Sequence, residues 1–356
     1  MLYLRSKNKK VLFKTSLALL GIGLGFGIFF LINDKPLISN PIKNISQSLN
    51  PAEKVVDEPF KEMTIPYVKN RSYESELGDL EQTSQNSNFT SYLTNYDSDG
   101  LRVNGLLTIP EGEQPLNGWP AIIFIHGYIA PSTYLTLTRY VDHVNFLARN
   151  GFVVFKIDLR GHGNSEGEPG GAYYSEDYII DALNARAALQ SADFVNPDGI
   201  GFWGHSMAGN VILRSIAARP DIPAAVIWAG AVYTYEDFQE YRLNDNSYRP
   251  PSMSTRRSAR RQQLFDTHGE FDSSSSFWSK VPATNFLDGV ETAIQLHHAS
   301  DDNVVNIRYS SNLNDILDNT SISHEFYEYS SGGHNITGSS FNSAMQRTVD
   351  FFKKNL

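Results

Sequence analysis

The sequence contains no cysteine, which removes several kinds of chemistry at once. Disulfide bridges, thiolate nucleophiles, cysteine zinc sites and a lipid-modified N-terminal cysteine are all excluded. Basic charge is also scarce, since 30 lysine and arginine residues stand against 39 aspartate and glutamate residues. The formal net charge is −9, so the chain has no basic excess to neutralise phosphates. We therefore expect no nucleic-acid partner.

Charged residues are missing from one long stretch near the N-terminus. Residues 16–32 read SLALLGIGLGFGIFFLI, and residues 11–13 extend this run if Lys14 snorkels to the interface. A membrane-spanning helix needs about 20 apolar residues, with a lower limit near 17. Because residues 1–10 are basic, the N-terminus is expected on the cytoplasmic side. We predict a basic cytoplasmic tail over 1–10 and a transmembrane signal-anchor over 11–33, with the rest of the chain extracytoplasmic.

Secretion after cleavage of a signal peptide is the alternative, although no clear small-x-small cleavage site follows the apolar run. The next residues, 34–85, are polar and weakly patterned, which predicts a spacer with a short ordered piece around Met63 to Val68. A folded domain is predicted over 86–356. It begins with two alternating segments, 89–95 and 101–109, joined by turn residues, which indicates an antiparallel hairpin.

Strands and helices then alternate along the chain. The predicted strands are 121–125, 152–158, 200–203, 224–228, 293–297 and 323–329. The predicted helices are 140–149, 175–190, 208–219, 312–317 and 341–352. This alternation is typical of an α/β fold with a mostly parallel central sheet and helices on both faces. A polar and aromatic insertion at 232–281 interrupts it and is predicted to form a small helical cap over the carboxyl ends of the strands.

Four arginines of this cap stand in a helical pattern, and they are expected to form either a solvated face or a site for an acidic substrate or lipid headgroup: Arg256, Arg257, Arg260 and Arg261. Elsewhere in the sequence no metal-ligand cluster stands out, so we expect no metal and no cofactor. Asp158 and Arg160 lie in a turn-rich segment after a strand and are interpreted as residues that stabilise this turn.

One serine stands at the junction between a strand and a helix. The segment reads Gly-His-Ser-Met-Ala-Gly over residues 204–209, with a small residue two places from Ser206 on each side. A nucleophile elbow needs small residues there because the serine lies in a sharp, strained turn. The pattern G-x-S-x-G is met except that Ala208 replaces the second glycine. A tight turn whose serine merely caps the following helix fits the same pattern.

The order of these segments resembles the α/β-hydrolase fold, and more narrowly the catalytic domain of prolyl-oligopeptidase-type (S9-like) serine hydrolases and their single-domain esterase relatives. The resemblance covers residues 89–356. It rests on 99–107, 125–127, 158–165, 203–209, 301–305 and 332–334, taken in that order.

The resemblance implies a catalytic triad in the chain order serine, acid, histidine. Ser206 is then the nucleophile, Asp301 the acid and His334 the base. Asp302 is the rival acid, but the spacing to Val304 favours Asp301. The backbone N–H groups of Met207 and Tyr128 are expected to form the oxyanion hole.

Three functions remain open on the sequence alone. The first is a serine hydrolase that cleaves small esters or short peptides, including an S9-type peptidase proper. The second is a non-catalytic extracellular binding domain on a hydrolase scaffold. The third is a transferase that uses the same acyl-enzyme. The complete set of Ser206, Asp301 and His334 favours an enzyme, and the absence of a recognisable propeller-like segment in the spacer favours an esterase.

Overall fold

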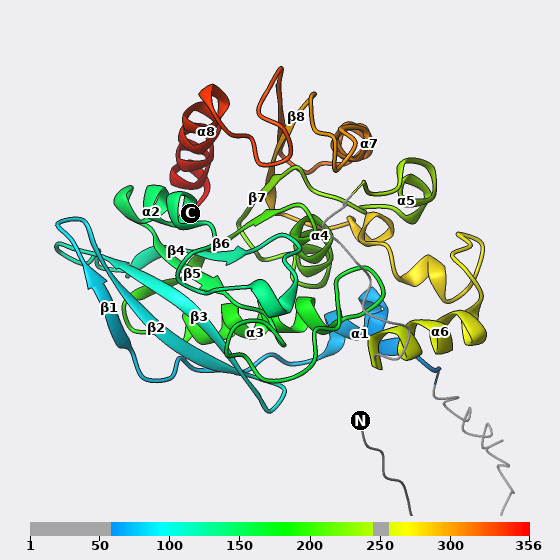
Figure 1. Ribbon diagram of the computed structural model, residues 1–356, viewed down its shortest axis with the longest axis horizontal. Coiled ribbons are helices and arrows are strands. Elements are labelled where there is room, and N and C mark those ends of the chain that lie inside the picture. The colour runs from blue at the N-terminus through cyan, green and yellow to red at the C-terminus, as the bar shows by residue number, and fades with distance from the viewer. Residues whose placement is uncertain (1–57, 245–255) are drawn as a thin grey trace, which may run out of the picture. The chain divides into compact units, whose positions relative to one another are not determined.

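A mixed β-sheet lies at the centre of the computed structural model, which describes residues 58–244 and 256–356 (Figure 1). Within these residues the sheet has nine strands in the order β1-β2-β3-β5-β4-β6-β7-β8-β9. The first three pairings are antiparallel and the remaining five are parallel. The strands are β1 (Glu81–Gln85), β2 (Phe89–Ser98), β3 (Leu101–Pro110), β4 (Trp119–Ile125), β5 (Val153–Ile157), β6 (Val195–His205), β7 (Ala224–Trp228), β8 (Ala293–Ala299) and β9 (His324–Tyr329).

The predicted antiparallel hairpin is confirmed and extends further than the sequence pattern indicates. Strands β2 and β3 pair continuously from Phe89 with Pro110 to Ser98 with Leu101. The two residues of the connecting turn, Asp99 and Gly100, both have positive φ. Aspartate and glycine tolerate this backbone conformation, so the sequence of the turn explains its tightness.

Helices cover both faces of the sheet, as predicted. On one face α3 (Asp177–Gln190), α4 (Ala208–Ala218) and α7 (Arg308–Leu317) contribute to the larger apolar core. On the other face α2 (Val141–Arg149) and α8 (Ser339–Asn355) contribute to a second core. Alternate residues of β4 separate the two cores, since Ile123 belongs to the first and Phe124 to the second.

The described part of the predicted spacer is folded, so the folded unit begins before residue 86. It contains η1 (Lys61–Met63), α1 (Ile65–Asn70) and β1, of which the sequence predicts only the piece around Met63 to Val68. Met63 is fully buried, and its carbonyl accepts a hydrogen bond from the buried guanidinium of Arg214 in α4. Strand β1 escapes prediction because all five of its side chains are exposed and carry no apolar alternation.

The described part of the cap at 232–281 contains three short helices, α5 (Tyr235–Tyr241), α6 (Arg256–His268) and η3 (Trp278–Lys280), joined to the rest by non-helical segments. Its apolar core includes Leu264, Trp278 and, from outside the cap, Met63. The segment just before η1 also contacts the cap, because Lys280 Nζ lies 3.1 Å from Glu58 Oε2 and the His268 Nε2–H group donates to the Pro59 carbonyl at 2.8 Å.

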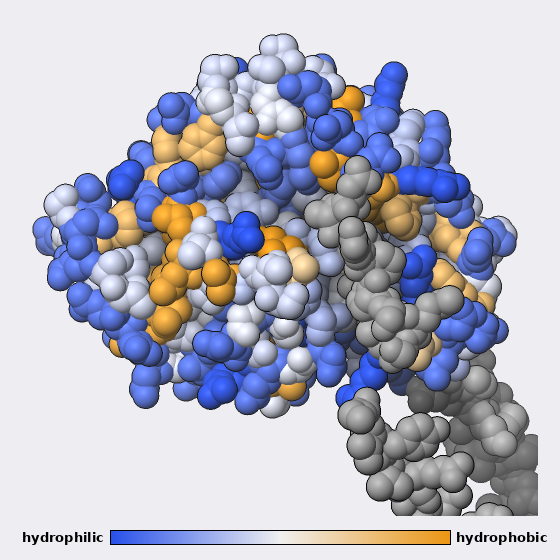
Figure 2. Space-filling model, viewed as in Figure 1, coloured by the Kyte–Doolittle hydropathy of each residue, from blue (hydrophilic) through white to orange (hydrophobic). Residues whose placement is uncertain are grey.

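In the part of the chain that the structure describes, no helix is both long enough and apolar enough to cross a bilayer. The predicted tail over 1–10 and anchor over 11–33 lie outside the described residues. The molecular face in Figure 2 is largely hydrophilic, with separate smaller hydrophobic areas.

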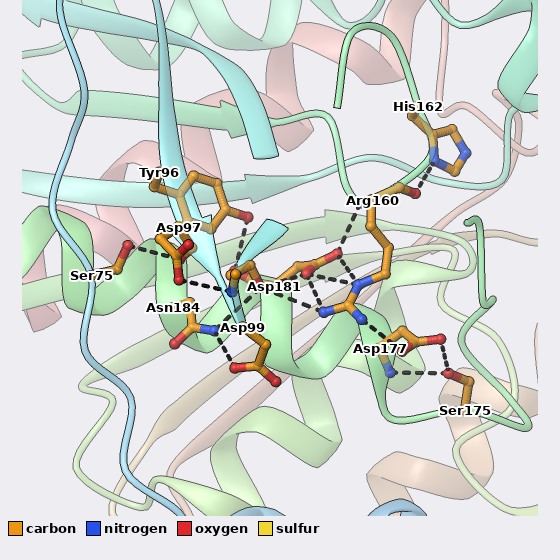
Figure 3. Close-up of polar contacts among 12 residues, drawn as sticks. Ser75, Tyr96, Asp97, Asp99, Arg160, His162, Ser175, Asp177, Asp181 and Asn184 are labelled. Carbon is orange, nitrogen blue, oxygen red and sulfur yellow. Dashed lines mark hydrogen bonds and ion pairs between the residues drawn. The ribbon is translucent and has the colours of Figure 1, made fainter. Parts of the chain in front are cut away.

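A buried ion cluster fixes the turn after β5 to helix α3 (Figure 3). The side chain of Asp181 in α3 is inaccessible to solvent, and its Oδ1 lies 2.7 Å from Arg160 Nη2. Arg160 Nη1 lies 2.8 Å from Asp177 Oδ1, and the Ser98 hydroxyl donates to Asp181 Oδ1 at 2.6 Å. Asp158, at the start of the same turn, accepts hydrogen bonds from Tyr134 and Thr136. These are contacts of turn-stabilising residues, in agreement with the sequence analysis.

Candidate active site

Ser206 lies between β6 and α4, in the sharp turn that the sequence predicts. Its φ is +55°, in the left-handed region that residues other than glycine rarely occupy. The backbone stabilises this conformation, because the Ser206 N–H donates to the Trp228 carbonyl and the Ser206 carbonyl accepts from the Gly209 N–H, both at 2.9 Å. A serine held in a strained strand-to-helix turn has the geometry of a nucleophile elbow.

The small residues on either side of Ser206 have a steric cause. A Cβ atom at Gly204 would lie 2.6 Å from the Ala208 Cβ and 2.7 Å from Ile212 Cδ1, so residue 204 must be glycine. The Ala208 methyl group occupies the space that glycine leaves at 204. The departure from the G-x-S-x-G pattern is therefore accommodated by the elbow itself.

The structure pairs His334 with Asp302, and the expected pairing with Asp301 is wrong. His334 Nδ1 lies 2.8 Å from Asp302 Oδ2. Asp301 instead accepts backbone hydrogen bonds from Gly333 at 2.8 Å and Gly332 at 3.2 Å, in the loop that leads to His334. Asp302 was the rival candidate in the sequence, and it is the carboxylate that meets the imidazole.

The turn after β8 explains why Asp302 points inward. The Asp302 N–H donates to the carbonyl of Ala299, the last residue of β8, and its Oδ1 accepts from the N–H groups of Val304 and Val305 at 2.8 and 3.0 Å. These bonds turn the side chain of Asp302 into the protein, while Asp301 faces the neighbouring loop and is exposed. The spacing to Val304, which favoured Asp301 in the sequence, did not reveal that Asp302 is the aspartate that caps this turn.

A second histidine shares the carboxylate of Asp302. His298 Nε2 lies 3.1 Å from Asp302 Oδ2, and its Nδ1 lies 2.8 Å from the Ser310 hydroxyl. Both the His298 and the Asp302 side chains are inaccessible to solvent. Burial by itself raises the pKa of Asp302. The hydrogen bonds from His298 and His334 lower it by more than burial raises it, so the pKa of Asp302 lies well below the usual range. Asp302 therefore stays ionised at neutral pH.

Four of the five residues predicted for the catalytic site line one large cavity of about 2050 Å³, and Asp301 does not. Ser206, Met207, Tyr128 and His334 all line it. Among the described residues, no hydrogen bond joins the Ser206 hydroxyl to His334 Nε2. Catalytic hydrogen bonds are often long without substrate and tighten only when substrate binds. The structure thus brings these four residues to one cavity wall without closing the serine–imidazole contact.

The loop after β4 presents the backbone of Tyr128 in a fixed orientation. The Gly127 carbonyl lies 2.7 Å from Nδ1 of the fully buried His126. Burial lowers the pKa of His126 to about 3, so this imidazole is neutral. In a trans peptide the carbonyl and the next N–H point in opposite directions, so a fixed Gly127 carbonyl also fixes the Tyr128 N–H.

The cavity extends from Ser206 toward the cap and toward α2 and α8. On the cap side it is lined by aromatic and charged residues, including Tyr173, Tyr174, Phe238, Arg256, Arg260, Arg261 and Phe265. Arg260 is paired with Glu176, and Arg261 lies over the Tyr174 ring at 4.5 Å. On the other side it is lined by Tyr140, His143 and Phe341. Over the two described ranges no group of three or more histidine, aspartate or glutamate residues is arranged to hold a metal ion.

The fold and its matches confirm the resemblance to the α/β-hydrolase superfamily, and the chain has the fold of that superfamily. A family model described as "Serine aminopeptidase, S33" matches residues 120–250. The thiohydrolase aneE of Aspergillus aculeatus is 32% identical over 111 residues, which are 31% of this chain and 32% of that protein. The chain thus spans about a third of that relative's length.

Solved structures give the same fold. An acetyl xylan esterase from Paenibacillus sp. R4 aligns over 82% of this chain and 92% of its own, with a TM-score of 0.60 and 16% identity. Dipeptidyl peptidase 4 of Porphyromonas gingivalis aligns over 76% of this chain and 36% of its own, with a TM-score of 0.58 and 20% identity. These two solved structures are an esterase and a peptidase.

Proposed function

We propose that this protein is a serine hydrolase that cleaves ester or amide bonds through an acyl-enzyme. The observation that carries the proposal is the pairing of His334 Nδ1 with the buried, ionised Asp302 on the cavity that the strained Ser206 also lines. A carboxylate bound to Nδ1 fixes the imidazole tautomer in which Nε2 is free to accept a proton. His334 then acts as general base toward Ser206.

In the proposed reaction Ser206 Oγ attacks the carbonyl carbon while its proton moves to His334. The imidazolium that forms is stabilised by Asp302. Negative charge on the tetrahedral oxygen is met by the N–H groups of Met207 and Tyr128, and Met207 is the N-cap residue of α4, where the helix dipole also favours negative charge. His334 gives the proton to the leaving group as its bond to the carbonyl carbon breaks. Water then attacks the acyl carbon while His334 takes its proton, and His334 passes a proton to Ser206 Oγ as the acid is released.

We propose small or medium esters as the preferred substrates, with short peptides as the alternative class. Esters are chemically the easier substrates, and the aromatic side chains of Tyr173, Phe238 and Phe265 offer apolar contact to an acyl or aromatic group. Both esterases and peptidases share this fold, so the fold alone does not favour either.

Labelling of the full-length protein with a fluorophosphonate, followed by a panel of p-nitrophenyl esters and aminoacyl anilides, tests these proposals. We expect labelling and ester turnover that Ser206→Ala abolishes. Absence of Ser206-dependent labelling would support the binding-domain alternative. A higher kcat/KM for anilides than for any short-chain ester would overturn the ester preference.

We also propose that residues 11–33 anchor the protein in a membrane with the hydrolase domain on the extracytoplasmic side. The uncharged run and the basic residues before it support this proposal. Protease added to intact cells or spheroplasts should digest the domain. Complete protection would contradict this topology, and a shortened chain in the medium would support cleavage and secretion instead.

A further inference from the structure

Three hydrogen bonds in series, here called the hydrogen-bond chain, connect Gly127, Tyr140, His205 and His334 next to the proposed catalytic residues. The Gly127 N–H donates to the Tyr140 hydroxyl at 3.0 Å, and this hydroxyl lies 2.8 Å from His205 Nδ1. His205 Nε2 lies 2.8 Å from the backbone carbonyl of His334. The hydrogen-bond chain therefore connects the loop of the proposed oxyanion donor to the loop of the proposed base. It passes through His205, the residue directly before Ser206.

The hydrogens of this chain can be assigned from chemistry. The His334 carbonyl can only accept, so His205 Nε2 must carry a hydrogen. Burial lowers the pKa of His205 well below its ordinary value, so the imidazole is neutral and its Nδ1 is an acceptor. Burial raises the pKa of Tyr140 to about 12, so its hydroxyl keeps the proton that it donates to Nδ1. Every donor in the chain thus has an acceptor.

Close packing restricts the side chains of Tyr140 and His205 in the hydrogen-bond chain. The ring of His205 packs on the ring of His334 with 4.5 Å between their centroids, and His205 is only 4% exposed. A Cβ atom at Gly127 would lie 2.9 Å from both the Tyr140 hydroxyl and His205 Nδ1. Tyr140 itself has a φ of +59° at the N-cap of α2, a conformation that a tyrosine seldom adopts. A strained backbone persists where the surrounding structure determines it, here around a side chain that bridges two loops.

We propose that Tyr140 and His205 are positioning residues that hold the loop of Tyr128 and the loop of His334 in a fixed relation to Ser206. The inference rests on the proposed serine-hydrolase function. Neither residue transfers a proton in the reaction. Their hydrogen bonds fix the two backbones that carry the proposed oxyanion donor and the proposed base. Such positioning stabilises the transition state more than the bound substrate, so its loss lowers kcat and leaves KM nearly unchanged.

The test compares Tyr140→Phe, His205→Phe and the double variant with wild-type full-length protein. Each single variant should lower kcat on the order of tenfold, with KM within about twofold. The double variant should be about as active as the worse single one, because either change breaks the same chain. His205→Gln should recover most of the activity lost in His205→Phe, since a glutamine amide can still donate to the His334 carbonyl.

Tyr134→Phe is the matched control. Tyr134 lies in the same loop, is buried and donates to Asp158 at 2.8 Å, but it is not part of the chain. Its loss should lower the melting temperature and leave kcat unchanged. The far-downfield proton signal of the His334–Asp302 hydrogen bond should move in Tyr140→Phe and His205→Phe but not in Tyr134→Phe, although none of these side chains touches Asp302.

Two results would overturn the inference: kcat within twofold of wild type in both Tyr140→Phe and His205→Phe, or losses that simply multiply in the double variant. If His205→Phe does not fold, Tyr140→Phe alone decides, because it removes one oxygen atom. A wild-type protein without Ser206-dependent hydrolysis would instead refute the proposed function, whereas an active wild type with fully active variants refutes only the positioning role.

Discussion

The carboxylates of Asp181 and Asp302 are both completely shielded from water, and they have different partners. Asp181 is bound by the guanidinium of Arg160, which never loses its charge, whereas Asp302 is bound by the imidazoles of His334 and His298. The first carboxylate and its partner join a turn to a helix. The second is paired with imidazole rings, the kind of side chain that serves as a general base. The same kind of buried charge therefore serves structure in one place and, in the proposed mechanism, supports chemistry in the other.

The difference predicts that the two sites fail in different ways. Loss of the Asp302 charge should nearly abolish turnover and leave the protein folded. An asparagine at 302 keeps one oxygen that can accept the N–H groups of Val304 and Val305. Loss of the Arg160 charge should weaken the fold and leave the chemistry of the folded molecules unchanged, because Arg160 does not line the cavity. The comparison holds if the Asp302 variant loses mainly kcat and the Arg160 variant loses mainly stability.

The largest effect is expected for Asp302→Asn. Without the carboxylate, His334 loses its tautomer preference and the imidazolium its stabilising charge, so kcat should fall by about 10³- to 10⁴-fold. Steady-state kinetics on a p-nitrophenyl ester, with active sites counted by fluorophosphonate, measures this fall. The melting temperature is the control and should fall less than in Arg160→Met, although the depressed pKa of Asp302 shows that its charge also stabilises the fold. A loss of less than tenfold would remove Asp302 from the triad.

The next effect concerns stability and Arg160→Met. This change leaves Asp181 buried without its cation, which typically costs about 3–5 kcal/mol of unfolding free energy. Denaturant unfolding measures the loss, and kcat per folded molecule at low temperature should stay near the wild-type value. Arg102→Met is the surface control, because Arg102 and Glu166 are 3.7 Å apart and at least half exposed, and it should cost less than about 1 kcal/mol. Equal losses in both variants would contradict the comparison.

Buried histidines without a carboxylate partner give a third case. Burial lowers the pKa of His126 and His297 to about 3 and that of His143 to about 4. In the unfolded chain these imidazoles titrate near 6.5. Between pH 6.5 and about 4 the unfolded state therefore binds protons that the folded state excludes, so the free energy of unfolding falls as the pH falls. Asp158, whose pKa burial raises to about 6, acts in the opposite direction below that pH.

His297→Gln should make this pH dependence shallower, by about 1.4 kcal/mol per pH unit in that window. Unfolding curves of wild type and variant at several pH values between 8 and 4.5 give the two slopes. Above pH 7 the slopes should coincide, which controls for any constant loss of the contacts that His297 makes with Tyr329 and Gln295. Identical slopes below pH 6 would mean that His297 accepts a proton in the folded state.

The sequence predicts those parts of the molecule whose pattern is local. The apolar runs of β4 to β8, the turn at Asp99–Gly100 and the elbow at Ser206 each have a signature of their own in neighbouring residues. The folded segment at 58–85 was only partly predicted, because β1 is polar and exposed and η1 contributes through the single buried residue Met63. Its contacts to Arg214 and to the cap depend on residues about 150 or more positions away, which no local pattern encodes.

The site divides in the same way. Ser206 and His334 follow from a motif and from chain order, and both line the cavity as expected. The choice between Asp301 and Asp302 depends on the direction in which one turn rotates two adjacent side chains, which spacing alone does not determine. The contacts of Tyr140, His205 and His298 join segments from 4 to 129 residues apart. These residues carried no signal of function in the sequence because their roles exist only through folded neighbours.

The smallest effect is expected for Asp301→Asn, and it tests the corrected assignment directly. Asp301 is exposed, and within residues 58–244 and 256–356 it accepts hydrogen bonds only from the backbone N–H groups of Gly332 and Gly333. Asparagine keeps one carbonyl oxygen that can accept the shorter of these bonds, so the loop of His334 should hold its position and kcat should fall by less than about threefold. Asp301→Leu removes both acceptors and should cost somewhat more than the asparagine variant. The same kinetic measurement as for Asp302→Asn applies, and the ranking of the two asparagine variants is the decisive quantity. A larger loss for Asp301→Asn than for Asp302→Asn would restore Asp301 as the acid and would mean that the His334 loop moves during the reaction.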